Sequence, residues 1–343
     1  MTTWKLLPVS AFSEYTGQWD ALNQQLYQSH PLFDSRFVGA LLKHFGNPQA
    51  ILAVYPATAG HRGNLLLLEP RKLGVWGTFM PSQTQIAPLL CGYPEALPGL
   101  FAVLPGLPVM IDVLCQDPLY TFLTQSLDYT DNLSHALTIN IDVTNNFADY
   151  WQQRPKNLRQ NIRSYSNRLK KNGLDSQIKI VSNIEEMPDA LARYGEIETS
   201  GWKGGEGTAI HASNLQGLFY IDVLKAFATT GQAEIIEFYI NDQLAASRIC
   251  LINTEMLITL KTTFNESFSF YSPSHLMLYL LIEREFLLKR VRYVEFYTNA
   301  KPEQLFWCTG QRPIEHLSIF RSATVQWMLR CLQGVKAKLA KTR

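Results

Sequence analysis

The sequence predicts a mixed α/β protein of two tandem domains, each with a mostly antiparallel sheet flanked by helices. The chain has 343 residues, about two domains at roughly 150 residues each. Hydrophobic residues make up 46% of it and charged residues 17%, a composition that can bury a core and excludes a disordered chain. Segments with helical spacing of apolar residues alternate with short apolar runs that are typical of strands.

In the first half, apolar residues at helical spacing predict a helix over 35–45, with Gly46 as its stop. We expect strands at 50–55, 64–68, 109–113 and 136–141, and a helix near 118–126. Six of the 17 prolines lie between Pro81 and Pro108. Proline fixes φ and lacks a donor, so this stretch is expected to be mostly turns, short strands and loop.

The second half begins with a basic helix over 156–171, a strand at 177–182 and helices over 187–199 and 214–230. Runs at 233–240, 244–252 and 256–263 are separated by short polar connections, which predicts an antiparallel meander. A helix at 274–289, a strand at 293–297, a helical turn at 302–307, a strand at 314–320 and a final helix from about 323 follow.

The two halves share a weak internal repeat and differ in charge. A helix ending in LLKHFG before one strand resembles a helix ending in VLKAFA before another, as two related domains would. Residues 1–150 hold 6 Lys/Arg and 11 Asp/Glu, a net −5, whereas residues 151–343 hold 25 and 18, a net +7. We therefore predict domains over 1–147 and 148–343, the second facing an anionic partner. The charge density is too low for a binder of duplex DNA.

Several functional classes lack support in the sequence. The five cysteines are widely spaced without a CxxC pair, and the seven histidines lack metal-ligand spacing, so we expect neither a disulfide framework nor a metal. GxSxG and GxGxxG are absent, which argues against a hydrolase and a dehydrogenase. The N-terminus has no signal-peptide pattern, and a cytoplasmic protein is expected.

The start of the helix over 274–289 is the first candidate site. Ser272 suits the N-cap and Pro273 the first helical position, which places Ser274 and His275 in the first turn. The unpaired N–H groups of a helix start can hold a phosphate. The alternative is a well-capped helix without a ligand.

Two further candidates combine lysine with an unusual setting. Lys261 lies in an otherwise apolar strand, so its ammonium is expected to reach an anion or, at an edge, solvent. Trp202 and Lys203 lie in a glycine-rich loop, GWKGGEG, which lacks the spacing of a phosphate-binding Walker loop. Trp202 is expected either to stack on a ring or to fill a domain interface.

Two basic segments are candidate contacts for anionic partners. The helix region 154–171 carries seven Lys/Arg and no acid, which fits phosphates or a solvated face. The tail over 327–343 mixes apolar and basic residues without an acid, which fits anionic lipid or RNA. The alternative is a last helix packed on its own domain.

Several segments of the second half resemble those of a known family. The strings RLKKNG, SGWKG, GTA and LKTTFNESFSFYSPSHLML are similar to those of the CelD/BcsL-type acetyltransferases of the Gcn5-related N-acetyltransferase (GNAT) superfamily, relatives of the FemAB peptidyltransferases. The resemblance covers about residues 150–320. It implies two such folds in tandem, the first degenerate, and acetyl-CoA or another acyl-CoA as co-substrate.

The chain departs from the pattern of these relatives in two places. The signature Arg/Gln-x-x-Gly-x-Gly/Ala is absent, and Ser274 stands where relatives have glycine. FemAB relatives without the signature use aminoacyl-tRNA, so the resemblance leaves CoA and tRNA donors open. As acceptor it implies an amine of a small molecule or of a glycan or cell-envelope precursor.

The mechanism that we expect is attack of an amine on a thioester or ester carbonyl. The strand at Thr259, Leu260 and Lys261 would supply a backbone N–H to the oxyanion. Ser272, Ser274 and His275 would hold the donor, with Tyr271, Trp202 and Lys203 near the acceptor. Tyr297 would protonate the leaving group, and Glu237 or His275 would accept the amine proton.

A non-catalytic accessory protein of polysaccharide or envelope assembly is the rival from another class. In that case the fold is a binding module, docked at the inner face of the membrane by the basic tail.

Overall fold

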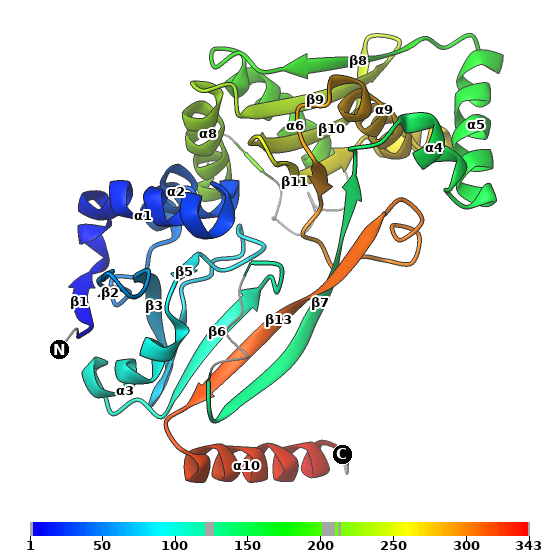
Figure 1. Ribbon diagram of the computed structural model, residues 1–343. Helices are drawn as coiled ribbons and strands as arrows, with labels where there is room; N and C mark the ends of the chain where they lie inside the picture. The colour runs from blue at the N-terminus through cyan, green and yellow to red at the C-terminus, as the bar shows by residue number, and fades with distance from the viewer. Residues whose placement is uncertain (1–2, 121–126, 201–209, 212–213, 342–343) are drawn as a thin grey trace. The chain divides into compact units, whose positions relative to one another are not determined.

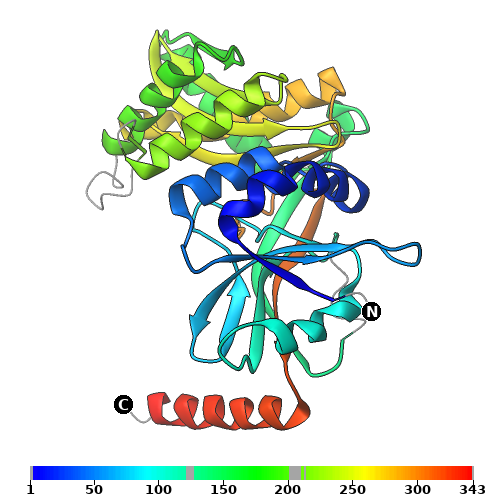
Figure 2. The ribbon, with the colours of Figure 1, turned by 90° about the vertical axis from the view of Figure 1, so that its left-hand side faces the viewer.

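The computed structural model describes residues 3–120, 127–200, 210–211 and 214–341, which fall into two compact units (Figures 1 and 2). Unit 1 comprises Met1–Leu137 and Pro313–Arg343, and unit 2 comprises Thr138–Arg312. The chain thus returns to unit 1 near its end, whereas the sequence suggested a single passage near residue 147. It does so because two long strands, β7 (Thr130–Asp142) and β13 (Gly310–Phe320), each extend from one unit into the other.

Unit 1 contains a sheet in the order β1-β2-β3-β4-β6-β13, with β5 paired to β3. Its strands are β1 Lys5–Pro8, β2 Ile51–Tyr55, β3 Asn64–Lys72, β4 Val75–Thr78, β5 Leu89–Cys91 and β6 Met110–Gln116. Its helices are η1 Val9–Ala11, α1 Phe12–Tyr27, η2 Pro31–Phe33, α2 Ser35–Phe45, η3 Pro94–Gly99, α3 Leu100–Val103 and α10 Ala323–Lys341. The helix expected near 118–126 lies largely outside the described residues.

Unit 2 contains a sheet in the order β7-β12-β11-β10-β9-β8. Its strands besides β7 are β8 Ser176–Val181, β9 Ala233–Ile240, β10 Gln243–Ile252, β11 Met256–Phe264 and β12 Tyr293–Glu295. Its helices are α4 Phe147–Gln152, α5 Lys156–Lys171, α6 Met187–Ser200, α8 Leu215–Ala228, η5 Glu266–Tyr271 and α9 Pro273–Leu288. The predicted meander of β9, β10 and β11 is confirmed, and α5 has the predicted bounds.

The two sheets repeat one pattern. In each sheet, four strands pair antiparallel, and the fourth pairs in parallel with a fifth strand: β4 with β6 in unit 1 and β11 with β12 in unit 2. A closing strand then pairs antiparallel with the fifth. The closing strand is exchanged, because β13 pairs with β6 and β7 pairs with β12. The predicted class, mixed α/β with two related and mostly antiparallel units, is confirmed.

The sheet of unit 2 is covered on both faces (Figures 1 and 2). One face packs against α4, α5 and α9 in a core that includes Ile236, Phe238 and Cys250 of the sheet and Met277 and Leu281 of α9. On the other face, α6 and α8 place polar side chains against β9 and β11. Because successive side chains of a strand point to opposite faces, those that pack against α9 are separated from those that face α6 and α8.

Candidate active site

Strands β11 and β12 separate in the middle of unit 2. They pair in parallel only from Met256 to Ile258 with Tyr293–Glu295, and β11 then continues to Phe264. Beyond the last pair, the Thr259 hydroxyl donates to the Glu295 carbonyl at 3.3 Å. Glu295 is itself buried and bonded to Arg312 at 3.1 Å. The two strands therefore separate next to Glu295, which is held in place by its ion pair with Arg312.

A β-bulge lies in β11 next to this opening. In the β10–β11 register, Ile249 faces Lys261 and Cys250 faces Thr259, so Leu260 is the extra residue. A bulge turns backbone groups away from the regular ladder and often lies beside active sites. From the sequence, the oxyanion contact was expected at residues 259–261, and the structure places an irregular backbone there.

The start of α9 differs from its prediction in one respect. Pro273 occupies the first turn as expected, but Ser272 has left-handed backbone angles (φ 49°), and its side chain makes no capping bond to the described residues. Ser272 does occupy the predicted N-cap position, but without a side-chain bond, because it also ends the 3-10 helix η5 and its backbone is set by the junction. The helix start therefore lacks the side-chain cap that the sequence suggested.

The basic helix α5 lies beside this junction. Arg168 donates to the Phe270 carbonyl at 2.7 Å and covers the Phe270 ring, and Asn172 donates to the Tyr271 hydroxyl at 2.8 Å. One face of α5 forms an open hollow of about 310 Å³, lined by Gln160, Arg163, Ser164, Asn167, Arg168 and Lys171. Positive charge therefore borders the chain segment that leads into α9.

His275 points from the first turn of α9 into an aromatic setting. Its ring stacks with Trp307 at 6.3 Å and with Tyr165 at 6.2 Å between centroids. Burial lowers its pKa, and the positive charge of Arg248 lowers it further, against a smaller opposite effect of Glu303. The imidazole is therefore held neutral near neutral pH, as a proton acceptor requires.

Two other predicted residues lie on the opposite face of the sheet. The Lys261 ammonium donates to the Gln216 side chain at 3.3 Å and lies over the Tyr220 ring. Glu237 is fully buried and accepts a bond from Arg193 at 2.8 Å. The structure thus brings Glu237 and Lys261 to the α6/α8 side and His275 to the α9 side.

The remaining predicted residues are spread around these features. Tyr297 follows β12 with positive φ (45°), is buried, and lies under the Arg312 guanidinium. Ser274 follows Pro273 in the first turn of α9 and is partly buried. Trp202 and Lys203 lie outside the described residues.

Two groups of polar side chains were not foreseen from the sequence. Arg248 is buried in β10, and its sequence signal, a lone arginine in an apolar strand, was available. In unit 1, Cys115, His135 and His316 place ligand atoms within 4.8 Å of one another. Their wide separation in the chain hid this group, which offers sulfur and nitrogen donors of the kind that Zn²⁺ takes. However, the Cys115 N–H donates to Nδ1 of His316 at 2.9 Å, so a metal ion would have to displace that bond or the proton on Nε2.

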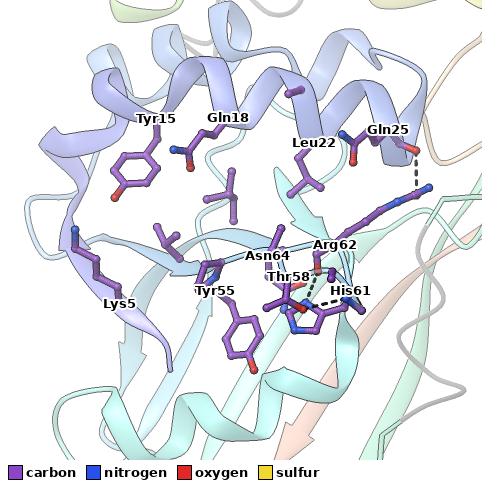
Figure 3. A pocket seen from close by; sticks show the side chains of 18 of the residues that line it. Lys5, Tyr15, Gln18, Leu22, Gln25, Tyr55, Thr58, His61, Arg62 and Asn64 are labelled. Carbon is purple, nitrogen blue, oxygen red and sulfur yellow. Dashed lines mark hydrogen bonds between the residues drawn. The ribbon is translucent and has the colours of Figure 1, made fainter. Parts of the chain in front are cut away.

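Unit 1 also contains an open pocket of about 860 Å³ that no sequence motif marks (Figure 3). Lys5 and Tyr15 lie at one end, and Arg62 at the other end donates to the Gln25 carbonyl at 3.2 Å. Tyr55 lies along its floor.

Comparison with known proteins agrees with the geometry of unit 2. A sequence model described as an acetyltransferase (GNAT) domain matches residues 156–304. No curated protein matches the chain.

Three solved structures share the fold over most of the chain. The C-terminal domain of a putative lysylphosphatidylglycerol synthetase from Agrobacterium fabrum has a TM-score of 0.56 at 10% identity, covering 93% of this chain and 96% of that one. FemX has a TM-score of 0.54 at 10% identity, covering 89% and 96%. A conserved protein of unknown function from Bacteroides thetaiotaomicron has a TM-score of 0.52 at 11% identity, covering 93% and 100%.

At such low identity, these three structures extend the likeness in fold to both units and say nothing of substrate. The finer CelD/BcsL-type assignment stays a prediction. Residues 156–304, which contain the opening between β11 and β12, match a GNAT-type acetyltransferase domain.

Proposed function

We propose that unit 2 transfers an acyl group, in the simplest case acetyl, from an acyl-CoA to an amine of a small molecule or glycan precursor. The opening between β11 and β12, with the bulge at Leu260 beside it, carries this proposal. An extended acyl carrier can enter between separated strands and bond to their backbone. The match to an acetyltransferase domain over the same residues supports this assignment.

The charges of unit 2 fit the anionic end of such a donor. At the start of α9, Pro273 has no N–H and the His275 and Leu276 N–H groups bond to the Ser272 carbonyl, so the Ser274 N–H and the partial positive charge of the helix end are what the donor would meet. Arg163, Arg168 and Lys171 line the neighbouring hollow on α5. Phosphates held there would direct the acyl end toward the bulge.

The reaction would proceed by direct displacement. The amine nitrogen attacks the thioester carbon, a C–N bond forms, and the C–S bond breaks. The backbone near Leu260 stabilises the oxyanion. His275, which is neutral near neutral pH because its pKa is lowered, takes the amine proton, and Tyr297 returns a proton to the CoA thiolate.

Calorimetric titration of the full chain with acetyl-CoA, CoA and longer acyl-CoAs tests the proposal. One-to-one binding is expected. It should weaken about tenfold when Arg163→Glu and Lys171→Glu place negative charge in the hollow. Lys170→Glu on the same helix, outside the hollow, serves as the matched control. Absence of binding with every CoA compound would refute a CoA donor.

The basic face of α5 also favours aminoacyl-tRNA as the donor. This second candidate predicts that a charged tRNA binds, that its binding falls steeply with salt, and that acetyl-CoA does not compete. The same α5 variants would weaken it, so the competition result separates the two donors.

The membrane contact is a separate proposal. Trp327, Met328 and Leu332 of α10 are exposed, which suits an anionic lipid surface. Among the described helices, none is both long and apolar enough to cross a bilayer. Pelleting with vesicles that contain anionic lipid, compared with neutral vesicles, tests this contact.

A further inference from the structure

Arg248 of β10 is a buried cation without the partners that such a group needs. Its exposed fraction is 5%. The Nε and Nη1 atoms are inaccessible to solvent and have no hydrogen-bond partner among the described residues. Among the described residues, these two atoms have lost their hydration without gaining a counter-ion, which is costly. An anion bound from outside the described residues would remove this cost.

The side chain lies on the α9 face of the sheet. Alternation along β10 places Arg248 on the same face as Ala246 and Cys250, and both of these belong to the core that packs against α9. Across the ladder it is opposite Ile236 and Thr262, neither of which carries a charge. Arg248 directly precedes Ile249, whose pairing with Lys261 borders the bulge at Leu260.

Its electrostatic surroundings contain neutral groups. Burial lowers the pKa of Arg248, and the residues that act against this effect are Cys250 and Tyr194. Burial raises the pKa of both of those groups, so they stay uncharged. His275, which lies across from it on α9, is kept neutral as well. A carboxylate or phosphate entering here would meet an unbalanced positive charge.

We propose that Arg248 binds an anionic group, a carboxylate or a phosphate, of a substrate that reacts in unit 2. The inference rests on the proposed acyl transfer for its location beside the reacting carbonyl. The two Nη atoms at the end of a guanidinium present parallel N–H donors that match such an oxyanion, and Nη1 of Arg248 is one of them. The anion belongs either to the donor or to an acceptor that carries an acid group near its amine, as an amino acid does.

Anion binding by the full chain tests the proposal. Thermal unfolding is followed while inorganic phosphate or acetate is added, with acetamide as the neutral analogue of acetate. The wild type should be stabilised by both anions and not by acetamide. In Arg248→Met the apparent Kd for phosphate should rise at least about tenfold, since two charge-assisted bonds are lost. Arg248→Lys should retain part of the response.

Arg193→Met provides the matched control. Arg193 is an arginine of the same domain that is already paired with Glu237, so its loss should lower stability and leave the anion response unchanged. A phosphate response that is equal in wild type and Arg248→Met, or absent from both, would overturn the assignment.

A CoA titration separates the two sources of the anion. If Arg248→Met also weakens CoA binding about tenfold, the group belongs to the donor. If CoA binds both proteins equally while the phosphate response is lost, the group belongs to the acceptor. If CoA and acyl-CoAs bind neither protein, the proposed function fails, and the phosphate response still decides the role of Arg248.

Discussion

Two groups of buried charge on the α9 side of unit 2 contrast in how they are balanced. In the first, Glu234 of β9 and Glu285 of α9 are bonded to both Arg284 and Arg290, at 2.6 to 2.9 Å. In the second, two of the guanidinium nitrogens of Arg248 have no partner among the described residues. The paired group ties a strand to a helix, whereas the Arg248 guanidinium has donors that the described residues leave for a ligand.

The pKa shifts follow the same division. Burial alone would raise the pKa of Glu234, but Arg290 and Arg284 outweigh it and lower the value. For Arg248, burial dominates and lowers the pKa, against smaller opposite effects of Cys250 and Tyr194. Buried charge by itself therefore says little about function, and the state of its partners says more.

The largest expected effect comes from breaking the paired group. Arg290→Met leaves two buried carboxylates with only Arg284, so the free energy of unfolding should fall by about 3–5 kcal/mol. Urea unfolding measures it. Arg292→Met, at an exposed neighbouring position, should change it by less than about 0.5 kcal/mol. Equal effects of the two substitutions would refute a structural role for the pairing.

Removing the unpaired charge should act in the opposite direction. Arg248→Met replaces a desolvated guanidinium with an apolar side chain of similar length, so the free energy of unfolding in ligand-free buffer should rise by about 1–3 kcal/mol. The same urea experiment measures it. A loss of stability would mean that Arg248 has a partner in its own chain, and the contrast between the two groups would disappear.

A smaller effect is expected in the pH dependence. The pKa of His275 is lowered by burial and by Arg248, so the unfolded chain binds the proton more tightly than the folded one. Stability should therefore fall as the pH decreases below about 6.5, the unfolded value. In Arg248→Met the pKa of His275 should rise and this loss should shrink. An NMR titration of the imidazole measures this pKa. An unaltered pKa would show that Arg248 does not act on His275.

The smallest effect is expected at the surface. Lys179 and Glu186 form an ion pair at 3.8 Å with both side chains about half exposed. Lys179→Ala should change the free energy of unfolding by less than about 1 kcal/mol. A larger loss would show that exposed pairs in this protein behave like the buried group, and burial would then no longer explain the strength of the pairing.

The sequence predicted most of the fold because its signals are local. The basic helix α5 carries buried Leu158, Ile162 and Leu169 at helical spacing, and the meander is marked by short polar connections. The exchange of β7 and β13 was not predictable, since strand partners far apart in the chain leave no local pattern. The two helices of the weak repeat, α2 and α8, precede β2 and β9, which are second from the outer end of their sheets.

The site was predicted less well than the fold. His275 and residues 259–261 were found because a helix start and a polar residue in an apolar strand are visible in the sequence. Whether Lys261 shares a face with His275 depends on the bulge at Leu260, which reverses the alternation. The absence of partners around Arg248 is a property of three-dimensional packing, so the sequence alone could not reveal it.

A crystal structure of the full chain soaked with inorganic phosphate tests most directly whether Arg248 is an anion-binding residue. We expect a phosphate within hydrogen-bond distance of the Nη atoms of Arg248, below the start of α9. A carboxylate of the protein itself bonded to the guanidinium, with phosphate excluded, would contradict this role.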